Sequence, residues 1–229
     1  MGAFRYKSLG RSLILLPMPL NIIIADDHSA VRIGTRSIIE RSGAGRVVAE
    51  AATAAELMAL LATHRCDVLV TDYAMPGSDI PDGYALISNI RRRHPALPIL
   101  LLSACNNANI IRIIRKAGVL GFVSKSGAAE ALPVALRTVQ RGSPYPGAMM
   151  QAPGHAGDGD PDRPADSRPL TPREIETVRL LGTGLTTNEI AALSHRSPST
   201  VSRQKGDAML KLGLENEAAL FRYVRRSGF

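Results

Sequence analysis

Short apolar runs alternate with helical patterns between residues 20 and 141. The runs are NIIIAD, RVVAEAA, DVLVTD, PILLLSA and LGFVSK, and four of the five are continuous rather than alternating. Continuous runs are typical of strands buried on both faces of a sheet. The intervening segments carry helix signals, including a capping box at Thr53 to Glu56 and helix-ending glycines at Gly43 and Gly118. Five strands alternating with five helices predict an α/β fold with a doubly wound, five-stranded parallel sheet.

Helical signals resume at Leu170, now without strand patterns. Two capping boxes begin at Thr171 and Thr186, and Ser197 followed by proline opens a third helix. Gly213 marks a helix end, which leaves a fourth helix in the last residues. The second half of the chain is therefore predicted to be a smaller all-α unit of four helices.

Two other stretches lack the pattern of a packed core. Residues 1–17 hold only a short apolar run after three basic residues, too short for an export signal, so we expect a disordered extension or a mis-assigned start. Residues 142–169 hold six of the fifteen prolines and four aspartates, as flexible linkers do. The predicted organisation is an extension over 1–17, an α/β domain over 18–142, a linker over 143–168 and a helical domain over 169–229.

The charge balance favours a polyanionic partner. The chain has 28 basic and 20 acidic residues, a net charge of +8, with ten basic against six acidic residues between 168 and 229. Nucleic acid is the commonest partner of such a surface. Cys66 and Cys105 give no disulfide framework and no metal-ligand spacing, and no segment approaches the ~20 apolar residues of a membrane span. We therefore expect a cytoplasmic protein without a membrane partner.

Chemically active residues follow four of the five predicted strands. Asp26 and Asp27 come after the first strand, Asp72 after the third, Ser103 after the fourth and Lys125 after the fifth. The carboxyl ends of parallel strands meet at one edge of a sheet, so these side chains should converge. Paired carboxylates suit Mg²⁺, and a separate aspartate beside a lysine and a hydroxyl suits a nucleophile that accepts a phosphoryl group. Asp72 is the predicted acceptor.

The strings around these residues, ADDH, VTDYAMP, DGYALI, LLSA and GFVSKS, resemble the receiver domain of two-component response regulators, from residue 21 to about 141. The resemblance implies a flavodoxin-like fold and phosphorylation of Asp72 by a histidine kinase or phosphotransfer protein. No enzyme activity beyond self-phosphotransfer and autodephosphorylation is expected. The Mg²⁺ ligands would be Asp72, Asp27 directly, Asp26 through water and the Ala74 carbonyl. The residues that would hold the phosphoryl group or move with the switch are Ser103, Lys125 and Phe122. The loop MPGSDIPDG is longer than is usual in that family.

The stretch TTNEIAALSHRSPSTVSRQKGDAMLKLG places two capped helices around a short turn, the arrangement of a helix-turn-helix. At 100° per residue, the second helix has an apolar face and a polar face that is free to enter a major groove. The apolar face comprises Val201, Ala208, Met209 and Leu212, and the outward face comprises Ser199, Arg203 and Gly206. The side chains expected to contact bases or phosphates are Thr187, Ser199, Ser202, Arg203 and Gln204.

Most of the last sixty residues also resemble the LuxR-type DNA-binding domain of the NarL/FixJ class of response regulators. The resemblance covers LTPREIETVRLLGTG and the helix-turn-helix that follows it. Lys205 stands where most members of the class have an aliphatic residue. We therefore expect its stem to pack inward and its ammonium to reach toward the DNA backbone.

The resulting hypothesis is a transcription regulator that phosphorylation of Asp72 switches into a DNA-binding homodimer. Ile110, Ile111 and Ile114, with Ile113 between them, exceed what one buried stripe requires, so their helix is predicted to form the dimer face. A two-fold pair would read two promoter half-sites one helical turn apart. A heterodimer with an auxiliary regulator stays open.

Two alternatives compete with this hypothesis. The first is a regulator that binds DNA independently of phosphorylation, together with a partner protein, and keeps its acids as structure. The second is an aspartyl-phosphate phosphotransferase, although enzymes of the haloacid-dehalogenase type need a second aspartate where this chain has Ala74.

Overall fold

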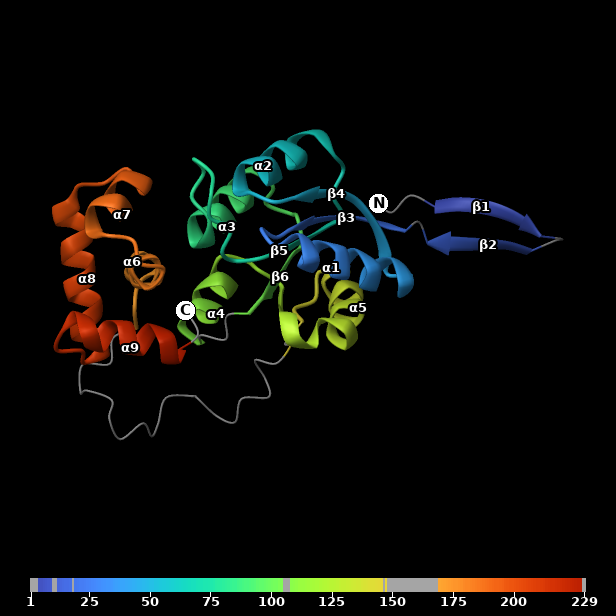
Figure 1. Ribbon diagram of the computed structural model, residues 1–229. Coiled ribbons are helices and arrows are strands. Elements are labelled where there is room, and N and C mark those ends of the chain that lie inside the picture. The colour runs from blue at the N-terminus through green and yellow to red at the C-terminus, as the bar shows by residue number, and fades with distance from the viewer. Residues whose placement is uncertain are drawn as a thin grey trace.

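The computed structural model describes residues 4–9, 12–17, 19–104, 108–145, 147 and 169–227. Its larger sheet has five parallel strands in the order β4-β3-β5-β6-β7 (Figure 1). The strands are β3 (Leu20–Ala25), β4 (Gly45–Ala51), β5 (Val68–Thr71), β6 (Ile99–Ser103) and β7 (Gly121–Ser124). The helices that alternate with them are α1 (Ser29–Arg41), α2 (Ala54–Thr63), α3 (Gly83–Arg93), α4 (Ala108–Lys116) and α5 (Ala128–Val139), with the short η1 (Lys125–Gly127) before α5. The predicted doubly wound parallel sheet is confirmed.

Successive residues of the interior strand β3 belong to two different apolar layers. Ile22 and Ile24 pack with residues of α1 and α5 on one face of the sheet. Ile23 packs with residues of α2, α3 and α4 on the other face. All three are buried, because each face is covered by helices. The continuous apolar runs in the sequence are explained by this double coverage.

The first seventeen residues contain a hairpin. β1 (Phe4–Leu9) and β2 (Ser12–Pro17) pair antiparallel from Phe4 opposite Pro17 to Leu9 opposite Ser12, and the hairpin extends away from the larger sheet (Figure 1). The prediction of a disordered extension is wrong on this point. Two six-residue runs separated by two residues, the first of them glycine, have the spacing of a two-residue hairpin turn.

The C-terminal unit contains α6 (Pro172–Gly182), α7 (Thr187–Leu193), α8 (Pro198–Leu212) and α9 (Glu217–Ser227). The predicted all-α unit is confirmed, and both of its capping boxes are formed, at Thr171 with Glu174 and at Thr186 with Glu189. Gly213 ends α8 with a φ of 65°, in the left-handed region where glycine is least strained. None of the described helices is long and apolar enough to cross a membrane.

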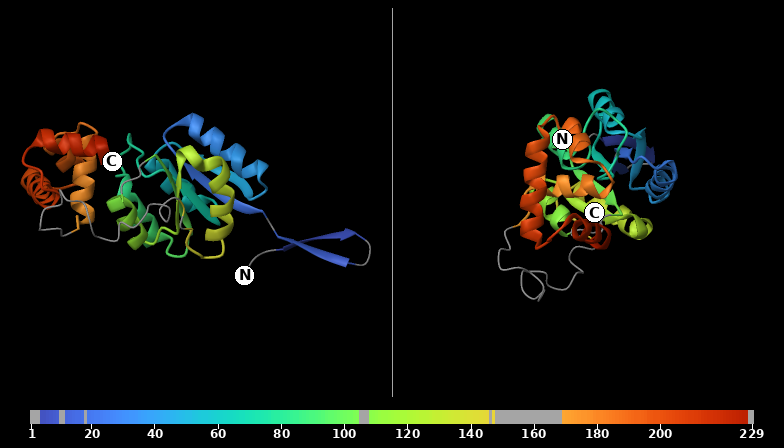
Figure 2. Two further views of the ribbon diagram at one scale, coloured as in Figure 1. Left: turned by 90° about the horizontal axis from the view of Figure 1, so that it is seen from below. Right: turned by 60° about the vertical axis from the view of Figure 1, so that its left-hand side comes forward.

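Helix α6 of the C-terminal unit packs against α3 and α4 of the sheet domain (Figures 1 and 2). One apolar core therefore runs through both domains and includes Leu170, Ile175 and Val178 together with residues of α4. Most of the predicted linker, residues 146 and 148–168, lies outside the described residues.

The isoleucines of α4 are not exposed in this arrangement. Ile110, Ile111, Ile113 and Ile114 are all buried. Ile110, Ile111 and Ile114, predicted to form the dimer face, are therefore not available for pairing in this arrangement, since α6 of the same chain packs on their helix. The surplus of isoleucine on α4 is explained by contact with a second domain of the same chain, and pairing of two receivers through this face stays a prediction.

Candidate functional site

The predicted acids and the predicted lysine meet at the carboxyl edge of the sheet. The Lys125 ammonium lies 2.6 Å from Asp72 Oδ2 and 2.7 Å from Asp26 Oδ2. Both carboxylates are buried, with Asp72 6% and Asp26 4% exposed. The backbone amides of Asp72 and Asp26 extend the strand pairing, donating to the carbonyls of Ala25 and Ala51. The positions of these side chains are thus fixed by the sheet itself.

The charge state of Lys125 follows from its two partners. Burial alone would lower the pKa of the ammonium, but hydrogen bonds to Asp26 and Asp72 and their negative charges outweigh burial, so the pKa is raised. Lys125 therefore remains a cation between two carboxylates. A fixed positive charge in this position can hold additional negative charge on Asp72.

The loop after β3 is organised by its own backbone and by α1. Asp26 Oδ1 accepts a hydrogen bond of 2.9 Å from the His28 amide, and the His28 ring lies 2.7 Å from Asp27 Oδ1. Arg32 donates to the carbonyls of Asp26, at 2.7 Å, and Asp27, at 3.3 Å. His28 is the N-cap residue of α1, and its exposed ring lies closer to Asp27 Oδ1, at 2.7 Å, than to Asp26 Oδ1, at 3.5 Å.

The donor set at this edge suits a hard divalent cation. Among the described residues, Asp26, Asp27 and His28 form the one group of three potential ligands whose atoms lie within 4.8 Å of one another. Asp72 is outside that group, and its oxygens are engaged by Lys125 and by the Tyr73 amide, which lies 2.6 Å from Oδ1. Carboxylate oxygens of this number and charge fit Mg²⁺, which would be held by Asp26, Asp27 and Asp72.

The other predicted residues of this site also lie at the same edge. Ser103 is buried at the end of β6, paired in register with Ser124 at the end of β7. Phe122 is buried within β7. Ala74 lies two residues beyond Asp72 and is half-buried. The structure thus places every predicted receiver residue at or next to the carboxyl edge of the sheet.

A buried charge cluster links this edge to the C-terminal unit. Arg179 of α6 is 5% exposed, and its Nη2 lies 2.5 Å from Asp82 Oδ1 and 2.6 Å from Glu176 Oε1. The guanidinium also lies 5.6 Å from the centre of the Tyr73 ring, and the Tyr73 hydroxyl donates to Glu176 Oε2 at 3.4 Å. Burial opposes charge on Arg179, but Glu176 and Asp82 more than offset it and raise its pKa.

This cluster reaches the residues that flank Asp72. Tyr73 is the neighbour of Asp72, and Asp82 Oδ2 accepts a 2.8 Å hydrogen bond from the amide of Met75. We did not predict Arg179 from the sequence. The available signal is its position beside Val178 and four residues after Ile175, on the buried face of α6, where an arginine requires a carboxylate partner.

The predicted DNA-reading face of α8 is accessible. Ser199, Ser202 and Arg203 are exposed, whereas Val201 and Ala208 are buried, as the helical periodicity predicts. Thr187 begins α7 and is half-buried. In the figures α8 lies on the side of the C-terminal unit away from the sheet, so the receiver does not cover it (Figures 1 and 2).

Two predicted DNA contacts are engaged within the protein. Gln204 is buried, and its Oε1 accepts hydrogen bonds from Thr177 Oγ1 at 3.1 Å and from Arg196 at 3.3 Å. Gln204 is predicted from the sequence to contact base or phosphate, whereas in this structure its side chain is engaged inside the protein. The Lys205 stem is half-buried as expected, but its ammonium pairs with Glu217 of α9 rather than pointing to solvent. Both residues hold α8 against its neighbours in this structure.

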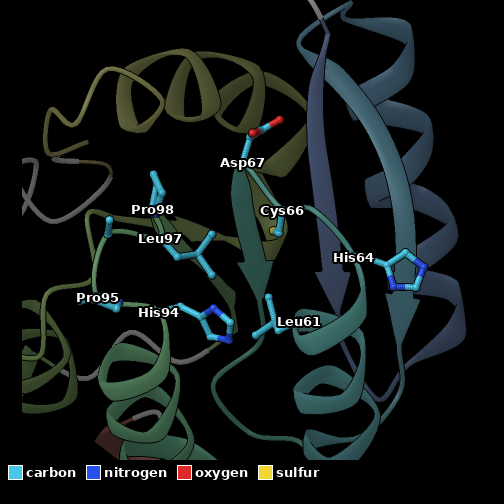
Figure 3. A pocket seen from close by; sticks show the side chains of 9 residues that line it. Leu61, His64, Cys66, Asp67, His94, Pro95, Leu97 and Pro98 are labelled. Atoms are coloured by element: carbon cyan, nitrogen blue, oxygen red, sulfur yellow. The ribbon is translucent and has the colours of Figure 1, made fainter. Parts of the chain in front are cut away.

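A cavity of about 400 Å³ lies at the opposite edge of the sheet, and its lining includes His64, Cys66 and His94 (Figure 3). In the close-up His94 lies near Leu61, while the His64 ring lies on the far side of Cys66. Burial raises the pKa of the Cys66 thiol to about 11, so the thiol is protonated at neutral pH. The two histidines and the thiol form neither a metal group nor a nucleophile.

Comparison with known proteins agrees with both halves of this description. Residues 22–137 match the response regulator receiver domain, and residues 168–224 match the bacterial regulatory proteins of the luxR family. The chain is 37% identical over 209 residues to the transcriptional regulatory protein RcsB of Salmonella typhi. The aligned region covers 90% of this chain and 94% of that protein. It is 30% identical over 211 residues to the oxygen regulatory protein NreC of Staphylococcus aureus, covering 90% of this chain and 96% of that protein.

Solved structures give the same result. RcsB of Salmonella enterica serovar Typhimurium bound to the promoter rprA with the phosphomimetic BeF₃⁻ superposes with a TM-score of 0.78 at 38% identity, over 90% of this chain and 98% of the other. A structure of two RcsB dimers bound to two parallel DNAs superposes with a TM-score of 0.75 at 36% identity, over 90% and 98% of the two chains. With its receiver domain and luxR-family domain both matched, the chain belongs to the response regulators of the two-component type, in the same family as RcsB.

Proposed function

We propose that the chain is a transcription regulator that binds promoter DNA and is switched by Mg²⁺-dependent phosphorylation of Asp72. The observation that carries the proposal is the position of Asp72, buried at the end of β5 with its Oδ2 2.6 Å from Lys125, in a chain that also presents an exposed helix-turn-helix. RcsB, which is 38% identical over the matched region, is bound to promoter DNA in the presence of a phosphomimetic.

Phosphorylation would be a transfer from the phosphohistidine of a kinase or phosphotransfer protein. A carboxylate oxygen of Asp72 attacks phosphorus, a P–O bond forms, the P–N bond breaks and the histidine nitrogen leaves with the electron pair. Lys125 faces the new negative charge, and Ser103 lies at the adjoining strand end. Mg²⁺ held by Asp26, Asp27 and Asp72 would supply charge neutralisation for the transferring oxygens. Loss of the phosphoryl group to water would return the carboxylate, so no other turnover is required.

The signal has a physical route to the second domain. A phosphoryl group on Asp72 adds charge beside Tyr73, whose ring and hydroxyl contact Arg179 and Glu176 of α6. Asp82 connects the amide of Met75, three residues after Asp72, to the same guanidinium. A shift of the loop over residues 74–82 must therefore alter a buried ion pair between the domains, which has a high energetic cost.

DNA would be read by α8. Arg203 has the geometry for a bidentate contact with guanine, and Ser199 and Ser202 can donate to phosphate or to base edges. Two copies on a two-fold axis would engage two half-sites, in line with the dimers on DNA formed by RcsB. The proposed partners are thus DNA, a phosphodonor protein, a second copy and, in some complexes, an auxiliary regulator, all in the cytoplasm.

The experiment combines labelling with footprinting. With Mg²⁺ and a small radioactive phosphodonor, the wild type should be labelled and Asp72→Asn should not, while Asp79→Asn, an exposed carboxylate in the same loop, should be labelled like the wild type. The phosphodonor should strengthen promoter protection only where Asp72 is present. Equal labelling of Asp72→Asn would disprove the acceptor.

The accessibility of α8 supports a second candidate function. Because the reading face is exposed while α6 is docked on the receiver, DNA binding independent of phosphorylation, together with a partner protein, has a structural basis here. Footprints that are identical for wild type and Asp72→Ala, with and without phosphodonor, would favour this candidate.

A further inference from the structure

A cavity of about 550 Å³ lies between the two domains. One wall is the loop over residues 74–82 with the start of α3, and the other comprises α6, α7 and the turn before α8. Its volume is in the range of small-molecule sites, which occur preferentially at domain interfaces. The cavity is beside the phosphorylation site but shares none of its charged groups.

The walls are mainly apolar. Met75 and Ile80 contribute from the receiver, and Leu180, Ile190 and Leu193 contribute from the helical unit. Leu193 is 44% exposed, so a large apolar side chain stands at the cavity in contact with water. An apolar body placed in the cavity would remove this surface from water, which is favourable at roughly 25 cal/mol per Å².

The charged residues of the lining fall into two sets. Asp82, Glu176 and Arg179 are joined in the buried cluster, whose two carboxylates and one guanidinium leave one negative charge. Arg173 and Arg196 also line the cavity, and within the described part of the chain neither of them forms an ion pair with a carboxylate. Arg196 makes one long hydrogen bond, 3.3 Å, to Gln204. Among the described residues the lining therefore has three arginines against two carboxylates, a net charge of +1, and Arg173 and Arg196 are the two cations outside the ion pairs.

These two guanidiniums repel each other. Both line the same cavity. Burial lowers the pKa of Arg196, and the positive charge of Arg173 acts in the same direction. A single anionic group between them would relieve this repulsion and accept charge-assisted hydrogen bonds from both. The charge of the site therefore selects an anion, and its apolar walls select an apolar body.

We propose that this cavity binds a small amphipathic anion, with an aromatic or aliphatic body against Met75, Ile80 and Leu180 and a carboxylate, sulfonate or phosphate group held by Arg173 and Arg196. The ligand contacts both domains at once. It binds only while the domains are docked and therefore stabilises the docked arrangement. The site is a second input to the regulator, distinct from the phosphoryl group on Asp72.

The test uses two fluorescent probes that share one ring system. 8-Anilinonaphthalene-1-sulfonate carries a sulfonate, and N-phenyl-1-naphthylamine has the same rings without a charge. Titration of the full chain should give one site for the sulfonate probe. Arg173→Gln and Arg196→Gln should each weaken its binding about tenfold, the typical effect of losing one charge-assisted hydrogen bond, and should leave the uncharged probe unchanged.

Two further variants make the test decisive. Arg92→Gln, which removes an exposed arginine of α3 outside the cavity, should bind both probes like the wild type. Ala85→Trp, at an exposed position in the cavity lining, should weaken both probes by filling the space. Arg173 is exposed, so its replacement should not disturb folding, which circular dichroism checks.

The proposal is overturned if the sulfonate probe binds equally to wild type, Arg173→Gln and Arg196→Gln, or if Ala85→Trp leaves both probes unaffected. Unchanged probe binding together with weaker DNA binding in the two arginine variants would assign the arginines to the DNA backbone instead. The readout needs neither phosphodonor nor DNA, so it stands or falls separately from the role of Asp72.

Discussion

Replacing Arg179 with methionine tests the buried charge cluster between the domains. Methionine keeps an unbranched stem of similar size and removes the guanidinium. Asp82, 2.5 Å from that guanidinium, and Glu176, 2.6 Å from it, then lose their cation. The change is confined to charge, because the apolar contacts of the stem are largely retained.

The expected loss of stability follows from the burial of Asp82 and the partial burial of Glu176. Removing one partner of a buried ion pair typically costs about 3–5 kcal/mol. Asp82 keeps its hydrogen bond from the Met75 amide, and the Glu176 side chain is 21% exposed, so water can partly solvate it. We therefore expect a loss near the lower limit, about 3 kcal/mol in the free energy of unfolding.

The assay is urea unfolding of the full chain, followed by circular dichroism, arranged as a double-mutant cycle. Arg179→Met and Asp82→Asn should each destabilise the protein, and the double variant should be little worse than either, with a coupling of about 2 kcal/mol. Arg92→Met, an exposed arginine of α3, is the control and should stay within about 0.5 kcal/mol of wild type. A loss below about 1 kcal/mol for Arg179→Met, or strictly additive effects, would refute the reasoning.

Three further changes probe the C-terminal unit. Burial raises the pKa of Glu174, but its bonds to Lys211 and to the Thr171 amide prevail, so its folded pKa lies below the usual 4.5. The contribution of Glu174 to the free energy of unfolding is therefore present above about pH 4.5 and is lost as the pH falls through the folded pKa. The urea midpoints of wild type and Glu174→Gln should accordingly converge between pH 7 and pH 3.5. Gly213→Ala, at a φ of 65°, should cost about 1 kcal/mol in thermal unfolding, and no change would contradict the left-handed cap. Gln204→Leu should cost about 1–3 kcal/mol because Thr177 loses its buried acceptor, whereas altered base preference at unchanged stability would restore Gln204 to the DNA contacts.

Features set by local physics could be predicted from the sequence. The strands are continuous apolar runs because both faces of the sheet are covered, and the capping boxes at Thr171 and Thr186 are contained within four residues each. The convergence of Asp26, Asp72 and Lys125 follows from strand direction alone. These predictions needed no knowledge of distant contacts.

The differences between the sequence predictions and the structure have physical causes. Gln204 lies three residues after Val201 and four before Ala208, so helical spacing places it on the inner face. A polar side chain at that spacing is buried together with its hydrogen-bond partners rather than exposed to DNA. The hairpin spacing in residues 4–17 is likewise visible in the sequence. The burial of the α4 isoleucines and the partners of Arg179 depend on how two domains dock, which no local pattern specifies.

Because α6 packs on α4, it competes with any other molecule that binds the isoleucine face of α4. Any partner that approaches the isoleucines of α4, a second receiver included, must first displace a segment tethered to the same chain, present at a local concentration that dilution cannot lower. The apparent association constant at that face equals the intrinsic constant multiplied by the fraction of molecules in which α6 has left. An intramolecular docking of about 2 kcal/mol would lower it about thirtyfold. Weakening the Arg179 cluster should therefore raise the affinity of self-association through this face without changing any residue on it.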